Sequence, residues 1–213
     1  MGLTMKSATI WDVEFLTDEG APQRFWCGPD DPDPVLVQIG AVRLALAEDF
    51  PILDRIEQVV IPRDRQGAEW PLSELFTRLT GLNRSRLAKD GIELGPALLA
   101  LDRFAAGDTI WAWGNDEIFA VAISCYLAGI KPPIPATQFG NATRLLVKAG
   151  VAKDEVHSLR SNTLCAHFGI SDDGAQAHDA LGDALSVAHV LQHLLRMGQL
   201  KPEDFNCDRR AWA

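Results

Sequence analysis

Two carboxylates stand two residues apart in the apolar stretch ATIWDVEF, residues 8–15. If this stretch is a strand, Asp12 and Glu14 leave the same face, because successive side chains of a strand point to opposite faces. Two carboxylates held this close repel each other, and they also lose hydration if the strand is central. A pair of acids at such a place suggests a chemical task, and holding a divalent cation is the task that suits their oxygen atoms.

A third acid stands where a helix is expected to begin. Asp116 follows Gly114 and Asn115 at the junction of a predicted strand and a predicted helix. In open α/β sheets, sites gather at the carboxyl ends of strands. Taken alone, Asp116 is explained more simply by its favourable interaction with the helix dipole.

The segment AHDALGDALSVAHVLQHLL holds two further acids and a histidine. His178 and Asp179 stand at the start of the last predicted helix, and Asp183 falls one turn inside it, close to its apolar stripe. We expect Asp183 to point towards the sheet, where an acid needs a partner such as a metal ion. Asp179 is a rival on a similar face, and spacing alone does not choose between them. An HD phosphohydrolase would also use His and Asp ligands, but its all-helical fold disagrees with the strand-rich first third.

Composition limits the classes of protein to be considered. The 213 residues are 47% hydrophobic and 23% charged, as in ordinary globular proteins, and no apolar run approaches the ~20 residues of a membrane span. The N-terminal residues do not resemble a signal peptide, and the four cysteines form no CxxC pair. We therefore expect a reduced, cytoplasmic protein. The net charge of −9 argues against a large basic surface for duplex DNA.

The chain changes character along its length. Strand-like runs rich in Val, Ile and Leu give way, from about residue 72, to a helical period. Strands are predicted at 8–15, 34–46, 55–61, 109–113 and 136–139, and helices at 93–107, from 115 to about 128, 141–150, 158–168 and 179–197. This order predicts one mixed sheet with helices packed on it. We expect one domain over 1–213, with a core of about 8–197 and a C-terminal tail at 198–213.

The chemistry-bearing residues also follow a recognisable order. D-x-E stands in WDVEF, a central Asp in WGNDEIF and H-x-A-x-x-D in HDALGD, with VQIGAV (37–42) and LTGL (79–82) between them. This arrangement resembles the DEDDh 3′–5′ exonucleases over nearly the whole chain, about residues 8–197. That family includes the DnaQ-like proofreading exonucleases, RNase T and the Eri/KapD-type exoribonucleases, and AWGNDE is most similar to the Eri type. The HxAxxD register selects Asp183 over Asp179.

The resemblance implies an α/β, RNase H-like fold. Its mixed five-stranded sheet would have three antiparallel strands followed by strand–helix units, with helices flanking the sheet. The implied activity is metal-dependent 3′–5′ hydrolysis of single-stranded nucleic acid, with RNA slightly favoured over DNA, and with release of nucleoside 5′-monophosphates. Two Mg²⁺ or Mn²⁺ ions would serve this chemistry, since two ions about 3.5–4 Å apart stabilise the attacking and leaving oxygens. They would also help an acidic protein to bind a 3′ end.

The resemblance also assigns roles. Asp12 would bridge both ions, Glu14 and Asp183 would complete the shell of one, and Asp116 would support the second. His178 would be the general base, a task that suits the ordinary pKa of ~6.5 of a histidine.

Substrate contacts are expected from two segments. Phe15 stands where the family usually has a small hydroxyl-bearing residue, so Phe15 or Leu16 could press on the last base. The LTG segment implies further contacts from Thr80, Gly81 and Leu82. The long loop 16–34 could close over the substrate, contact a second subunit in a homodimer, or be mobile.

Two alternatives stay open. A phosphodiesterase of the same fold, acting on short oligonucleotides or dinucleotides, would suit the acidic surface. A catalytically silent nucleic-acid-binding module is disfavoured, because all five catalytic-type residues are present.

Overall fold

A central six-stranded sheet carries the fold, in a computed structural model that describes residues 7–171 and 178–206. The strand order is β4-β3-β2-β1-β5-β6. The strands span Ser7–Phe15 (β1), Leu36–Ala45 (β2), Ile52–Val60 (β3), Gly91–Ile92 (β4), Ile110–Ala112 (β5) and Phe139–Asn141 (β6). β1, β2 and β3 pair antiparallel, and β5 then pairs parallel to β1 and β6 parallel to β5. The strand bearing the two acids therefore lies inside the sheet.

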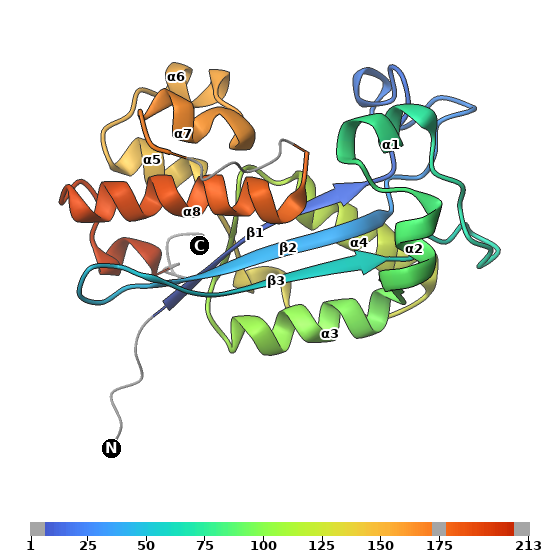
Figure 1. Ribbon diagram of the computed structural model, residues 1–213, viewed down its shortest axis with the longest axis horizontal. Helices are drawn as coiled ribbons and strands as arrows, with labels where there is room; N and C mark the ends of the chain where they lie inside the picture. Colours follow the sequence, from blue (N-terminus) through green and yellow to red (C-terminus); the bar gives the residue numbers. More distant parts are fainter. Residues whose placement is uncertain (1–6, 172–177, 207–213) are drawn as a thin grey trace.

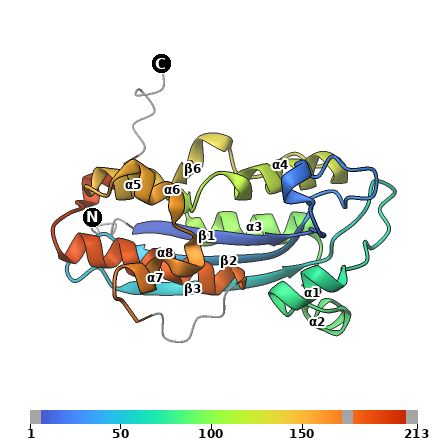
Figure 2. The ribbon, with the colours of Figure 1, turned by 90° about the horizontal axis from the view of Figure 1, so that it is seen from above.

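Helices cover both faces of this sheet (Figures 1 and 2). α8 (Ala180–Arg196) lies across β1 and β2 on one face, and α3 (Leu94–Ala105) and α4 (Asp116–Ala128) lie on the other. Successive side chains of β1 point to opposite faces of the sheet, so β1 contributes to the apolar core on both faces. Ile10 packs with α8, whereas Trp11 and Val13 pack with α3 and α4.

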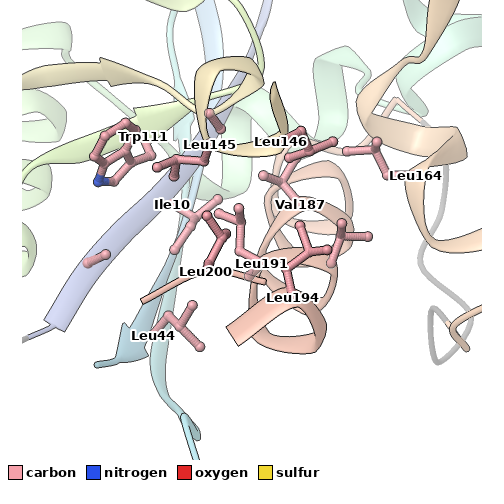
Figure 3. Close-up of a cluster of buried hydrophobic side chains, with 14 of the residues drawn as sticks. Ile10, Leu44, Trp111, Leu145, Leu146, Leu164, Val187, Leu191, Leu194 and Leu200 are labelled. Atoms are coloured by element: carbon pink, nitrogen blue, oxygen red, sulfur yellow. The ribbon is translucent and has the colours of Figure 1, made fainter. Parts of the chain in front are cut away.

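The larger apolar cluster joins α8 to the sheet (Figure 3). Ile10 and Leu44 face it from the sheet, and Val187, Leu191 and Leu194 face it from α8. Each of these side chains is at most 1% exposed. Burial of such a side chain stabilises a fold by about 1.5–3 kcal/mol, so this layer fixes the position of α8 over β1.

The other predicted strands and the long helices are confirmed, but the strand predicted at 136–139 is displaced, because residues 136–138 form a 3-10 turn and β6 begins at Phe139. The short helices are α1 (Glu74–Thr80), α2 (Arg84–Asp90), α5 (Thr143–Lys148), α6 (Lys153–Ser158) and α7 (Leu164–His167), with 3-10 turns at Pro22–Arg24, Ala136–Gln138, Ser161–Thr163 and Pro202–Phe205. The sheet has six strands rather than five, because the two-residue β4 follows α2. The single helix predicted at 158–168 is wrong, because α6 ends at Ser158 and a 3-10 turn separates it from α7.

The loop after β1 and the segment after α8 both pack on the core. Trp26 donates an indole hydrogen bond to the Leu16 carbonyl (3.0 Å) and contacts the Phe15 ring, so loop 16–34 folds back on the end of β1. Phe205 packs edge-on against Trp111. The rest of the predicted tail, 207–213, lies outside the described residues. Among the described helices, none has the length and apolar character to cross a membrane.

Candidate active site

Three carboxylates meet where β1 passes under the first turn of α8. One oxygen each from Asp12, Glu14 and Asp183 lies within 4.8 Å of the others. Asp12 and Asp183 are buried, and Glu14 is partly exposed. Residues from the first strand and the last helix are thus brought together, as the sequence predicts for these three acids.

Close approach of α8 to the sheet makes this meeting possible. Gly40 on β2 lies directly opposite Asp12, and a Cβ atom at this position would overlap the backbone of Ala180 and Leu181. Because Gly40 has no side chain, the start of α8 can pack closely against β1 and β2.

Gln38, opposite Glu14 on β2, ties the helix start to the sheet. Its amide nitrogen donates to Asp179 (2.8 Å) and Glu57 (3.1 Å), and its oxygen accepts from the Ala180 N–H (3.1 Å). Asp179 is itself the N-cap of α8, accepting from the Gly182 N–H. Asp179 therefore serves as a helix cap, whereas Asp183, one turn further along α8, points into the acidic cluster.

The central acid differs from the prediction. Asp116 is exposed at the first position of α4, whereas the next residue, Glu117, is 5% exposed and hydrogen-bonds the Asp12 carboxyl group. The prediction of Asp116 is corrected on this point, because the structure turns Glu117 rather than Asp116 towards the cluster. A signal for Glu117 is present in the sequence, since Ala120, Val121 and Ser124 follow it at the spacing of one helix face.

The acids raise one another's pKa values. Burial, followed by the charges of Glu117, Asp183 and Glu14, raises the pKa of Asp12 well above its usual range. Burial and the charges of Asp183 and Asp179 raise the pKa of Glu14 to about 8. The pKa of Asp183 rises to about 7 through burial and Asp179, against the backbone N–H of His178, which lowers it. Burial also raises the pKa of Glu117 to about 7.

This donor set fits a hard divalent cation. All ligand atoms in the cluster are carboxylate oxygens, which suit Mg²⁺ or Mn²⁺. Glu117 Oε2 is buried and has no hydrogen-bond partner among the described residues. Buried like charges are costly unless a cation offsets them, so the group has the chemistry of a metal site.

His178 stands beside the cluster in an unusual backbone conformation. Its φ of 61° lies in the left-handed region that non-glycine residues seldom adopt. The Asp183 carboxylate accepts its backbone N–H, and Asp179 caps the helix directly after it. The residue itself is exposed. The same carboxylate therefore belongs to the acidic cluster and holds the backbone of the histidine.

The predicted substrate contacts are placed differently. Leu16 and Leu82 are buried in an apolar cluster with Phe76, so their side chains are not open to a substrate. The Thr80 hydroxyl is buried, donating to the Phe76 carbonyl and accepting from the Leu82 N–H. These three predictions are corrected, because the LTG segment caps a helix and fills the core.

Two substrate predictions stay open. Gly81 is exposed, with φ of 74° at the end of α1. Phe15 is partly exposed, between Trp26 and the core cluster under α3 and α4.

The chain resembles solved structures rather than known sequences. No protein-family model matches it, and no curated protein sequence matches it. Solved structures do match. A full-length 3′-exonuclease aligns with a TM-score of 0.71 and 17% identity, over 93% of this chain and 64% of that one. A 3′-exonuclease that recognises the 3′ end of the histone mRNA stem-loop gives 0.70 and 17%, over 92% and 84%.

A third structure extends the likeness to a DNA enzyme. The E. coli ExoI complex with single-stranded DNA, in its zinc-bound form, aligns with a TM-score of 0.61 and 16% identity, over 95% of this chain and 43% of that one. The chain thus spans just under two thirds of the first structure and less than half of ExoI. The chain shares with these exonucleases a mixed sheet flanked by helices, which confirms the predicted α/β, RNase H-like fold class.

Proposed function

We propose that the protein is a metal-dependent 3′–5′ exonuclease that acts on single-stranded nucleic acid, with RNA favoured over DNA, and releases nucleoside 5′-monophosphates. The observation that carries this proposal is the meeting of Asp12, Glu14 and Asp183 within 4.8 Å, on a fold shared with 3′-exonucleases. Structures with that fold include complexes with a histone mRNA stem-loop and with single-stranded DNA, which supports a nucleic-acid substrate.

The carboxylates would hold two Mg²⁺ or Mn²⁺ ions. Asp12 contacts all of the other acids, since it hydrogen-bonds Glu117 and has an oxygen within 4.8 Å of Glu14 and Asp183. In this proposal Glu117 takes the place first predicted for Asp116. When bound, such ions polarise the attacking water and neutralise charge on the scissile phosphate.

The protein's own residues would orient and deprotonate the water. His178 is the proposed general base, which takes a proton from the attacking water. The His178 backbone N–H donates a hydrogen bond to Asp183, and the next residue, Asp179, caps α8 by accepting from the Gly182 N–H. These two hydrogen bonds fix the backbone at His178. Gln38 sets the start of α8, and with it the distance of Asp183 from β1.

Labelled substrates of graded length test the activity. The protein is incubated with 5′-labelled single-stranded RNA or DNA in Mn²⁺, Mg²⁺ or EDTA. We expect a metal-dependent ladder that shortens from the 3′ end, lost at least a hundredfold in Asp12→Ala and His178→Ala. Equal activity in EDTA, or internal cuts, would contradict the proposal. Cleavage limited to dinucleotides would favour the phosphodiesterase alternative.

A neighbouring pair of variants tests the corrected acid. Glu117→Gln and Asp116→Asn make the same chemical change at consecutive positions of α4. We expect Glu117→Gln to reduce kcat/KM at least a hundredfold and Asp116→Asn to change it less than about threefold, because only Glu117 contacts the cluster. The reverse order of effects would restore Asp116 as the ligand.

A further inference from the structure

Helix α4 is apolar on two faces, although only one of them packs against the sheet. Residues 118–130 carry no charged side chain. Ala120 and Val121 are buried in the core cluster beneath the helix, whereas Phe119 is 60% exposed and Tyr126 is 84% exposed. A helix that is apolar all round is normally buried on every side, so the outward face of α4 lacks the cover that its composition predicts.

The outward face forms one continuous stripe along the helix. Phe119, Ala122, Ile123 and Tyr126 follow the i, i+3, i+4, i+7 spacing of a single helix face, and we refer to them as the α4 stripe. Ala122 is exposed and Ile123 is partly exposed. The stripe therefore has a small residue at its middle and an aromatic ring at each end.

A loop places a third aromatic ring beside the α4 stripe. Phe25, in loop 16–34, is 82% exposed, and it lines a hollow of about 540 Å³ together with Ile123 and Tyr126. Figure 2 shows this loop next to α4. Phe25 and Trp26 have φ values of 55° and 51°, in the left-handed region that is unfavourable for residues with a side chain. A strained turn that holds an aromatic ring out in solvent suggests that the ring has a contact to make.

Charges beside the stripe cancel, which favours a second copy of this acidic chain as the partner. Asp33 and Arg65 also line the hollow, and the Arg65 guanidinium donates two hydrogen bonds to the Asp33 carboxylate (2.9 and 2.7 Å). Two copies with a net charge of −9 repel each other on approach. The α4 stripe and the hollow together form a face without uncompensated charge, so two copies can meet there without that repulsion.

An antiparallel pairing makes the α4 stripe complementary to itself. A two-fold axis between Ala122 and Ile123 sets Phe119 of one copy opposite Tyr126 of the other, where the hollow can receive the ring. The small side chain of Ala122 at the centre lets the two helices approach closely.

The same pairing brings opposite charges together at both ends of the helices. Asp116 is exposed at the first position of α4, and Lys131 is exposed just after the Gly129 cap at the other end. In the antiparallel pair, Asp116 of one copy faces the end of the helix that leads to Lys131 of the other. The helix dipoles are then also paired with opposite ends together.

The exposed area is close to what a dimer needs. An aromatic side chain presents about 150–250 Å², so the exposed fractions of Phe25, Phe119 and Tyr126 amount to roughly 450 Å² per copy. Two copies would bury about 900 Å² through these rings alone, and a specific interface buries about 1,000 Å² or more. The partly exposed Trp26 and Ile123 lie on the same face and add to this area.

We propose that two copies of the chain form a symmetric dimer through this face, with α4 packed antiparallel against α4 and Phe119 of each copy in the hollow beside Phe25 of the other. Of the roles expected for loop 16–34, this assigns contact with a second subunit. The dimer does not depend on the proposed function, because neither Phe25 nor the α4 stripe belongs to the acidic cluster.

Sedimentation equilibrium of the full chain tests the dimer with a matched pair of variants. At micromolar concentrations the wild type should approach twice the 23.3 kDa mass of one chain. Ala122→Glu places two carboxylates beside the two-fold axis, so the dissociation constant of the dimer should rise at least about a hundredfold. Ala88→Glu makes the same change at an exposed position of α2 outside this face, and the constant should stay within about twofold.

An exchange of charge between copies tests the symmetry of the contact. Ala122→Lys alone should also be monomeric, whereas an equimolar mixture of Ala122→Glu and Ala122→Lys should form dimers again, because opposite charges then meet at the axis. Recovery in the mixture supports a symmetric dimer through α4. Equal weakening by Ala122→Glu and Ala88→Glu, or no recovery in the mixture, would overturn the proposal. A wild type that stays monomeric throughout the micromolar range would also overturn it, and would leave this face to a different protein.

Discussion

Replacement of Asp183 by Asn should stabilise the metal-free protein at pH 8. The pKa of Asp183 rises from 3.8 to about 7 on folding, through burial and the charge of Asp179. A rise of roughly three units corresponds to about 4 kcal/mol at 1.36 kcal/mol per unit, so an ionised Asp183 destabilises the fold by up to that amount. This pKa already includes the hydrogen bond from the His178 N–H, but asparagine also buries an amide group in place of the carboxyl group, at a cost of about 1–3 kcal/mol where its N–H groups lack acceptors. A net gain of about 2 kcal/mol follows.

The sign of the pH dependence is fixed by the direction of the shift. Because the folded protein holds this proton more tightly than the unfolded chain, its stability falls as the pH rises from about 4 to about 7. The gain in Asp183→Asn should therefore be close to zero at pH 5 and about 2 kcal/mol at pH 8. For a chain of this length, 2 kcal/mol corresponds to about 4–8 °C in Tm.

Thermal unfolding in EDTA at pH 5 and pH 8 measures this effect, and addition of Mn²⁺ should reverse it. An ion present at a hundred times its Kd stabilises the wild type by about 2.7 kcal/mol, and the variant should gain much less. Asp204→Asn is the control, since its exposed partner Lys148 makes a surface ion pair worth less than about 1 kcal/mol. A lower Tm for Asp183→Asn in EDTA at pH 8 would refute the account of mutual repulsion.

Three further outcomes are expected. Gly40→Ala should lower the stability by about 1–3 kcal/mol in urea unfolding, because its methyl group meets the backbone of α8; an unchanged midpoint would contradict the close approach. Gln38→Glu places a carboxylate against Glu57 and Asp179, so its Tm should fall more at pH 8 than at pH 5; a pH-independent loss would point to packing instead. The affinity for Mn²⁺, followed by calorimetry, should rise from pH 6 to pH 8 as the pKa values of Glu14, at about 8, and its neighbours are passed; a flat profile would exclude these acids as ligands.

The parts of the site that depend on the spacing of residues within one strand or one helix could be predicted from the sequence. Asp12 and Glu14 follow the two-residue period of a strand, and Asp183 follows the apolar stripe of a helix. The spacing along the sequence therefore predicts which way each side chain points. At the start of α4, the buried acid is Glu117, one residue after the predicted Asp116. At a helix start, a step of one residue turns a side chain by about 100°, and only the apolar face of α4 indicates which acid is buried.

Other features depend on contacts that spacing does not reveal. The bond from Gln38 to Asp179 joins residues 141 apart in sequence. The resemblance of the LTG segment to a substrate-binding segment carries no information on burial. In the structure Leu82 lies in the core, and the Thr80 hydroxyl accepts a hydrogen bond from the Leu82 N–H. The helix predicted at 158–168 failed for a local reason, since the 3-10 turn at Ser161–Thr163 interrupts an otherwise apolar period.

The acidic cluster draws its members from the first strand and the last long helix, and this has a consequence during protein synthesis. At 5–20 residues per second, a ribosome adds Asp183 on the order of ten seconds after Asp12. Until then β1 carries Asp12 and Glu14 without Asp183, and the start of α8 is not yet packed against Gly40. A nascent or truncated chain that ends before α8 therefore lacks the complete cluster, and the cluster forms only after α8 has been made and has packed on β1.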